Sequence, residues 1–166
     1  YPWDFLIGAV HWVGGWSVDY GVSSYEFERR GVRQAYEDYF DLKTQLAASG
    51  VVDVLAHVDV VKRHRHVLPA PPTDLYAEVV AAAQASGTAV ELSSAGLHKP
   101  IGEMYPAPAF LEMFQRAGVP ITLASDAHAP EECGRDAALL VEEAKRVGYK
   151  GHLVFDQRHP TLRQFS

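Results

Sequence analysis

The sequence predicts a parallel α/β domain, and three observations lead to this fold class. Short apolar runs alternate along the 166-residue chain with longer amphipathic segments. Glycine follows the amphipathic segments, close to the next apolar run, as expected where a helix ends. No glycine-rich phosphate loop follows any apolar run, so a dinucleotide-binding or P-loop domain loses its main support. A doubly wound sheet and a (β/α) barrel both fit this alternation.

Four apolar runs are the predicted strands, and a fifth short strand is expected near the C-terminus. The four runs are nearly continuous in apolar character, which is typical of strands buried on both faces of a parallel sheet. A polar tail is expected to follow the fifth strand. The predicted strands are residues 5–10, 51–56, 88–92, 120–125 and 152–155.

Four amphipathic segments between the strands are the predicted helices. In the first, Tyr36, Phe40 and Leu46 recur at helical spacing and mark the face expected to pack inward. Asp74 is expected to cap the second helix, because a carboxylate can accept a hydrogen bond from the free N–H groups of the first turn. The predicted helices are residues 32–48, 74–85, 108–117 and 136–147.

Composition limits the possible partners of the chain. The 15 Lys and Arg residues against 21 Asp and Glu give a formal charge of −6, which argues against a nucleic-acid or anionic-membrane binder. No apolar run approaches the roughly 18 residues that a membrane span requires. Cys133 is the only cysteine, so an intrachain disulfide and cysteine-based zinc motifs are excluded, and a cytoplasmic location is expected.

Side chains that can bind metal ions follow three of the predicted strands directly. His11 follows the first strand, His57 the second, and Asp126 and His128 the fourth. The carboxyl ends of parallel strands face the ligand site in α/β folds, so these four side chains are expected at one rim. Residues two apart in an extended chain point to the same side, so Asp126 and His128 can face a common centre. Imidazole and carboxylate ligands suit Zn, Fe or Mn.

Structural explanations compete with this metal-site hypothesis. A single histidine near a strand end is more often a hydrogen-bonded structural residue than a ligand. Three coincident positions at one edge favour metal binding. A catalytic triad is not supported, because no Gly-x-Ser-x-Gly turn is present and the acidic neighbours of Cys133 do not favour a catalytic thiolate.

Five segments, in this order along almost the whole chain, resemble the histidinol-phosphatase branch of the PHP (polymerase and histidinol phosphatase) family. The segment Lys-Pro-x-Gly-Glu-x-Tyr-Pro makes the resemblance specific to the phosphatase branch. The segments are residues 7–11 (IGAVH), 56–59 (AHVD), 91–97 (ELSSAGL), 99–106 (KPIGEMYP) and 125–128 (SDAH).

The resemblance implies a single PHP-type domain over residues 1–166, the C-terminal part of a distorted (β/α)7 TIM-like barrel that is incomplete at the N-terminus. It implies a trinuclear Zn, Fe or Mn centre in the intact protein, with His11 and His57 as ligands of one ion, Asp126 of a second and His128 of a third. The implied reaction is hydrolysis of L-histidinol phosphate to L-histidinol and phosphate in histidine biosynthesis. Lys99 and Glu103 are candidates for contacts with substrate phosphate and ammonium. Asp126 is the candidate proton shuttle, and ligation alone is its alternative role.

Departures from the family pattern leave other functions open. The family's opening His-x-His motif, two further histidines and a bridging glutamate belong upstream of this chain, which starts at Tyr1 in strand-like sequence. His98 stands where arginine is common, which puts one phosphate contact in doubt. A surface salt bridge would explain Lys99 and Glu103 nearly as well. The alternatives are a phosphoesterase for another substrate, an amidohydrolase and a catalytically silent metal-binding fragment. The oligomeric state is not predicted.

Overall fold

A four-stranded parallel sheet forms the centre of the computed structural model, which describes all 166 residues. Its strands lie in the order β1 (Ile7–Gly8), β4 (Val54–Leu55), β5 (Ala89–Ser93) and β6 (Ile121–Ala124). Every neighbouring pair is parallel. The predicted parallel α/β class is therefore confirmed, although β1 and β4 are shorter than the apolar runs that contain them.

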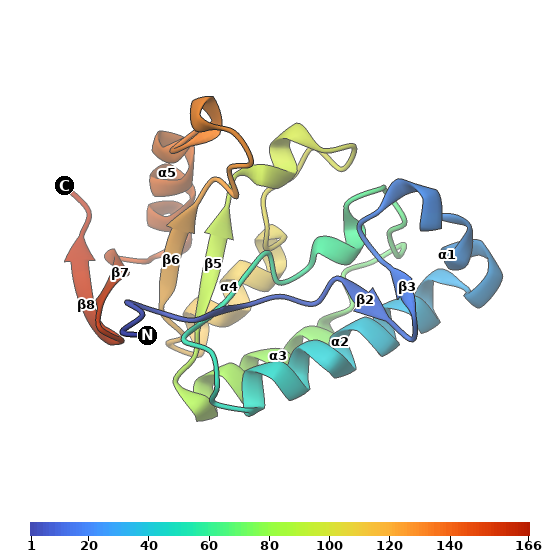
Figure 1. Ribbon diagram of the computed structural model, residues 1–166, viewed down its shortest axis with the longest axis horizontal. Coiled ribbons are helices and arrows are strands. Elements are labelled where there is room, and N and C mark those ends of the chain that lie inside the picture. The colour runs from blue at the N-terminus through green and yellow to red at the C-terminus, as the bar shows by residue number, and fades with distance from the viewer.

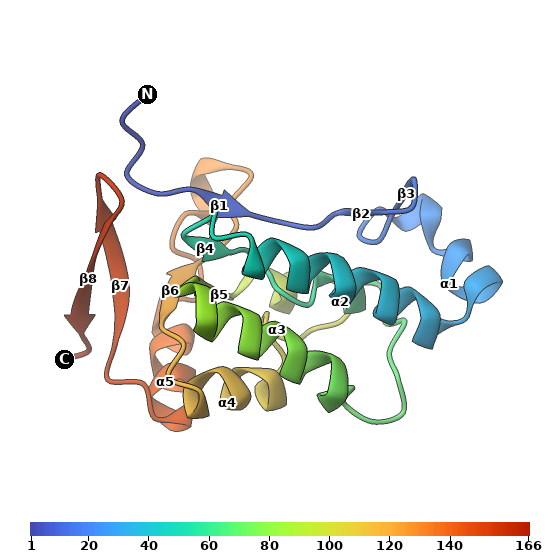
Figure 2. The ribbon, with the colours of Figure 1, turned by 90° about the horizontal axis from the view of Figure 1, so that it is seen from below.

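Helices follow one another along one side of this sheet (Figures 1 and 2). They are α2 (Val32–Ala48), α3 (Thr73–Ser86), α4 (Pro108–Arg116) and α5 (Ala137–Val147), each within a few residues of its predicted bounds. The role predicted for Asp74 is wrong. Pro72 occupies the N-cap position, and Asp74 lies in the first turn, where it pairs with Arg33 of α2.

Aromatic side chains form much of the core between α2, α3 and α4. Phe110 stacks on Tyr76 with ring centroids 4.0 Å apart and on Phe114 at 4.5 Å. Phe40 meets both Tyr76 and Phe110 edge-on. Edge-to-face and offset stacks are the favoured aromatic geometries, so this cluster fixes how the three helices pack.

Two antiparallel hairpins and several short helices were not predicted. The first hairpin joins β2 (Trp12–Val13) to β3 (Trp16–Ser17), and α1 (Tyr25–Arg30) follows it. The second joins β7 (Gly151–Asp156), which contains the predicted strand 152–155, to β8 (His159–Gln164); the expected polar tail is exposed, but it forms a strand. Single 3-10 turns lie at Gly21–Ser23, Val60–Lys62, Ala95–His98 and Pro130–Glu132.

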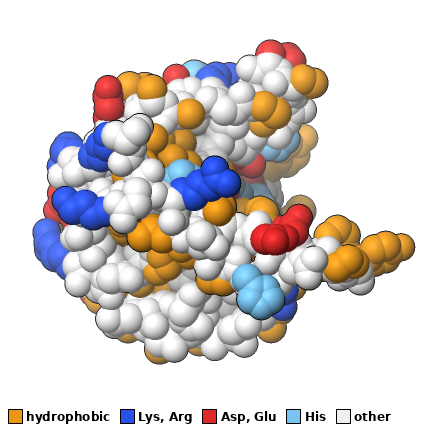
Figure 3. Space-filling view, turned by 90° about the vertical axis from the view of Figure 1, so that its left-hand side faces the viewer, with side chains coloured by type: hydrophobic (Ala, Val, Ile, Leu, Met, Phe, Trp, Pro, Cys, Tyr) orange, Lys and Arg blue, Asp and Glu red, His pale blue; other side chains and the backbone are white.

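The central sheet does not close into a barrel. Strand β1 lies at one edge and β6 at the other, and Ile7 is 49% exposed, so β1 is not buried on both faces as predicted. The side of the molecule that carries the β7–β8 hairpin shows hydrophobic side chains among charged ones (Figure 3). The turn of this hairpin contacts the start of the chain, where Arg158 N–H donates to the Asp4 carbonyl and Phe155 stacks on Phe5. None of the helices is long and apolar enough to span a lipid bilayer.

Candidate functional site

A cavity of about 120 Å³ lies at the carboxyl ends of the parallel strands and brings the four predicted metal ligands together. The four side chains that we expected at one rim thus line the same cavity. Nine residues line the cavity: His11, Asp19, His57, Val60, Arg63, Lys99, Tyr105, Asp126 and His128.

Short loops after successive strands supply the lining. His11 lies between β1 and β2, His57 follows β4, and Asp126 follows β6. Both His57 (φ 22°) and Asp126 (φ 50°) have positive φ angles, which are uncommon for residues other than glycine. Such strain is maintained only where the surrounding structure determines it, and it is common at functional sites.

His11 and Asp19 form a carboxylate–imidazole pair. Nδ1 of His11 lies 2.9 Å from Oδ2 of Asp19, and the Ser17 hydroxyl donates to the other carboxylate oxygen at 2.8 Å. Burial favours a higher pKa for Asp19, but the hydrogen bonds from Ser17 and His11 and the nearby Arg63 guanidinium more than offset it, so the net pKa is lowered. An ionised Asp19 fixes the His11 ring and leaves Nε2 free, as in many metal-ligating histidines.

His57 lies next to His11, with ring centroids 4.9 Å apart, and is almost fully buried. Its Nδ1 atom has no hydrogen-bond partner in the structure. Burial, together with the positive charges of Lys43 and His11, lowers the pKa of His57 to about 3. The ring is therefore neutral at physiological pH, which is the form that binds metal ions.

Asp126 and His128 form the exposed side of the cavity. The His128 backbone N–H donates to Oε2 of Glu132 at 2.8 Å, and its Nδ1 lies 2.9 Å from the Asp126 carbonyl oxygen. These contacts lie within one loop between β6 and α5. They leave Nε2 of His128 and the Asp126 carboxylate available to a ligand.

Two cations also line the cavity, Lys99 and Arg63. Arg63 was not singled out from the sequence, where it is one of several basic residues in a row. Glu103, the other predicted substrate contact, lies outside the cavity: its carboxylate accepts a hydrogen bond from Lys62 Nζ at 2.5 Å. Lys62 also pairs with buried Asp59 at 2.9 Å. This salt bridge is the alternative role that the sequence left open for Glu103, and its contact with substrate ammonium stays a prediction.

The donor set fits a divalent metal ion in its chemistry. It offers imidazoles and carboxylates, and Nδ1 of buried His57 has no hydrogen-bond partner within the chain. No group of three or more His, Cys, Asp or Glu side chains in the chain is arranged closely enough to hold a metal ion as the structure stands. Small side-chain movements would therefore have to accompany binding.

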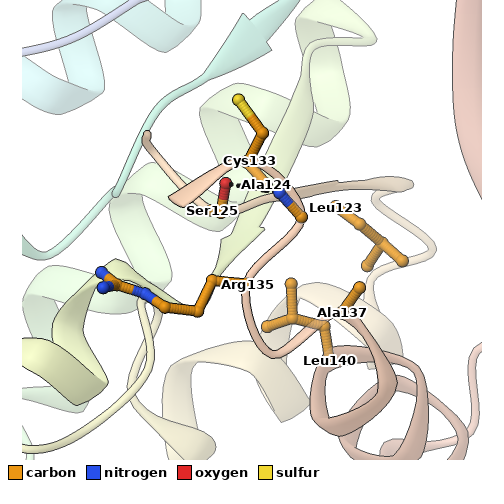
Figure 4. A pocket seen from close by; sticks show the side chains of 8 residues that line it. Leu123, Ala124, Ser125, Cys133, Arg135, Ala137 and Leu140 are labelled. Atoms are coloured by element: carbon orange, nitrogen blue, oxygen red, sulfur yellow. Dashed lines mark hydrogen bonds between the residues drawn. The ribbon is translucent and has the colours of Figure 1, made fainter. Parts of the chain in front are cut away.

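A second cavity of about 320 Å³ lies between β6 and the start of α5 (Figure 4). Leu123, Ala137 and Leu140 give it a mainly apolar lining. The Ser125 hydroxyl is engaged at 3.2 Å by the Gly134 N–H, and no predicted ligand points into this space. It is larger than the first cavity, and none of the four predicted metal ligands lines it.

Comparisons with known proteins show similarity in sequence and in fold. No family model matches the sequence. The chain is 38% identical over 148 residues to a protein named probable histidinol-phosphatase from Deinococcus radiodurans, a match that covers 89% of the chain and 56% of the relative. The fold of this chain is similar to that in the crystal structure of histidinol phosphate phosphatase from Lactococcus lactis subsp. lactis, complexed with Zn, L-histidinol and phosphate.

That structural match has a TM-score of 0.77 at 20% identity and covers 97% of this chain and 63% of the other. At this identity it establishes the fold alone, whereas the D. radiodurans match establishes a relationship in sequence. The chain is therefore a sequence relative of histidinol-phosphatases that shares their α/β fold and spans about half the length of the curated relative that it matches.

Proposed function

We propose that the protein is a metal-dependent phosphomonoester hydrolase that converts L-histidinol phosphate and water to L-histidinol and phosphate. The observation that carries the proposal is a single cavity that combines three imidazoles and two carboxylates with the cations Arg63 and Lys99. Imidazoles and carboxylates are typical metal ligands, and the cations complement a phosphate dianion. The name of the sequence relative and the ligands of the structural neighbour support the same substrate.

The proposal includes the ions that the site would hold. His11 and His57 would bind one divalent ion, Asp126 a second and His128 a third, in a trinuclear Zn, Fe or Mn centre of the intact protein. Such ions would neutralise charge on the phosphoryl group and acidify the attacking water. Zinc in the structural neighbour supports metal binding. The proposed number of ions rests on the family resemblance alone.

Charged side chains of the chain would hold the substrate. Arg63 can present a planar fork of N–H donors to phosphoryl oxygens, and Lys99 adds a point charge. Arg63 lies 3.7 Å from Asp19, so part of its charge is balanced before substrate binds. Positioning of this kind lowers the barrier because it fixes the phosphoryl group relative to the attacking water.

Asp126 is the proposed proton shuttle to the leaving alkoxide. Its carboxylate lines the cavity on the exposed side, where a departing alcohol can leave to solvent. A carboxyl group within hydrogen-bond reach of the leaving oxygen can supply the proton that the alkoxide requires. Ligation without proton transfer is the alternative role for this residue.

We also propose that residues 1–166 are one domain and part of a distorted (β/α)7 barrel. The open edge at β1, with Ile7 half exposed, supports this proposal because a parallel sheet normally has both faces and its edges covered. The remaining strands would lie in a part of the intact protein that corresponds to the unmatched part of the relative. Alternative functions are hydrolysis of another phosphate ester and a metal-binding fragment without activity.

An assay of purified protein separates these possibilities. Hydrolysis of L-histidinol phosphate is measured beside that of p-nitrophenyl phosphate, with and without a chelator, and the metal content is determined in parallel. We expect faster turnover of L-histidinol phosphate, its loss with chelator and its recovery with added metal. Similar rates on both substrates would favour a general phosphoesterase. Bound metal without turnover would favour the silent fragment.

A further inference from the structure

Buried side chains hold the backbone around His57 at three consecutive residues. Lys43 Nζ donates to the Ala56 carbonyl at 3.2 Å, the His57 N–H donates to Glu91 Oε2 at 2.8 Å, and the Tyr39 hydroxyl donates to the Val58 carbonyl at 3.1 Å. Tyr39 and Lys43 come from α2, and Glu91 comes from β5.

Lys43 and Glu91 hold the two ends of one peptide group. The Ala56 carbonyl and the His57 N–H belong to the same trans peptide, whose C=O and N–H point in opposite directions. The two side chains therefore reach this peptide from opposite sides and fix the orientation of its plane. His57 itself has the strained φ of 22°, and the following loop turns its ring toward the cavity.

Stability alone gives a poor reason for these two residues. Lys43 is fully buried and Glu91 nearly so, and burial of charged groups costs free energy that a single hydrogen bond does not recover. Apolar residues of similar size would pack in these places at lower cost. The position of these two polar side chains at the peptide of His57 explains their presence better.

We propose that Lys43 and Glu91 are positioning residues that fix the His57 backbone so that its imidazole faces the cavity. The inference rests on the proposed function, because it matters for activity only if His57 binds a metal ion. It also makes a prediction about the backbone that needs neither metal nor turnover. The two parts can therefore fail separately.

Hydrogen exchange of the His57 amide tests the backbone part directly. In Glu91→Ala this amide loses its acceptor, so we expect exchange about tenfold faster than in the unmodified protein. Glu91→Gln keeps an acceptor oxygen and is expected to restore slow exchange. Thr122→Val is the matched control, because Thr122 pairs with Glu91 across the sheet without touching the His57 peptide. Unchanged exchange at His57 in Glu91→Ala, or equal acceleration throughout β5, would overturn the proposal.

Isothermal titration calorimetry with zinc, on Lys43→Met and on Glu91→Ala, tests the consequence for the site. We expect Lys43→Met and Glu91→Ala to bind zinc about tenfold more weakly or worse, a typical loss for residues that orient a ligand. Lys43→Met removes a buried charge, so its melting temperature is expected to equal or exceed that of the unmodified protein; this variant carries the test if Glu91→Ala does not fold. Zinc affinity unchanged in both variants would overturn the positioning role. If the unmodified protein binds no zinc while the His57 amide still responds to Glu91→Ala, the backbone role stands and the proposed function fails.

Discussion

The two sides of the candidate site differ in how their residues are held. On the buried side, Ala56, His57 and Val58 are fixed by side chains from α2 and β5, which lie far from them in sequence. On the exposed side, the contacts of His128 come from Asp126 and Glu132 of the same loop. Long-range contacts couple a residue to the folded core, whereas local contacts leave it able to move with its loop. The buried side is thus preorganised, and the exposed side can adjust to a ligand.

The largest expected effect is on catalytic activity, and it tests whether the buried and exposed sides of the candidate site serve one reaction. His57→Ala and His128→Ala should each lower kcat/KM for L-histidinol phosphate by about a thousandfold or more, since each removes a proposed metal ligand. His159→Ala is the control, because His159 is exposed on β8 and outside the cavity. Steady-state kinetics on the three variants make the comparison. Wild-type rates in His57→Ala or His128→Ala would remove that residue from the site.

A smaller effect is expected in the pH dependence of stability, and it concerns Lys43 on the buried side of the site. Burial lowers the pKa of Lys43 from 10.5 to about 7, although the carboxylates of Glu91 and Asp59 oppose this shift. Between these values the unfolded chain binds a proton that the folded chain does not, so stability rises with pH in this window. Relative to Lys43→Met, the unmodified protein should gain roughly 3 to 4 kcal/mol between pH 7 and pH 10. Thermal unfolding of both proteins at the two pH values measures this gain, and a constant difference would contradict it.

The smallest effect compares one hydrogen bond on each side. Tyr39→Phe removes the hydroxyl that binds the Val58 carbonyl in the core, which should lower the free energy of unfolding by about 1 kcal/mol. Glu132→Ala removes the acceptor of the His128 N–H at the surface, where water can replace it, and should lower the free energy of unfolding by less than about 0.5 kcal/mol. Urea unfolding of the two variants provides the comparison. Equal losses would show that the two sides are held alike.

Sequence periodicity predicted the helices well because each buries one face against the sheet. Residues 32–48 match α2 in full, and four of the apolar runs overlap the strands of the parallel sheet. The C-terminal hairpin was missed because β8 is exposed along its length and carries no apolar alternation that would mark a strand. Barrel closure was predicted only through resemblance, and the four-stranded sheet does not confirm it.

The site was predicted in part, for a similar reason. Residues that follow strands directly, such as His57 and Asp126, could be found because parallel strands end at one edge. Asp19 and Arg63 follow no predicted strand, and only the folded chain brings them to the cavity. Lys43 lies in the middle of a helix, where a lysine normally indicates a solvent-exposed position, so its burial depends on contacts that periodicity does not record.

The central claim is that His11, His57, Asp126 and His128 form one metal site. Anomalous diffraction from crystals of the protein grown with zinc tests it most directly. We predict a zinc peak about 2.0–2.1 Å from an imidazole nitrogen of His57, with His11 as a further ligand, and no such peak in crystals of His57→Ala. Zinc found only at other histidines, or no ordered zinc in a crystal of the active protein, would contradict the account.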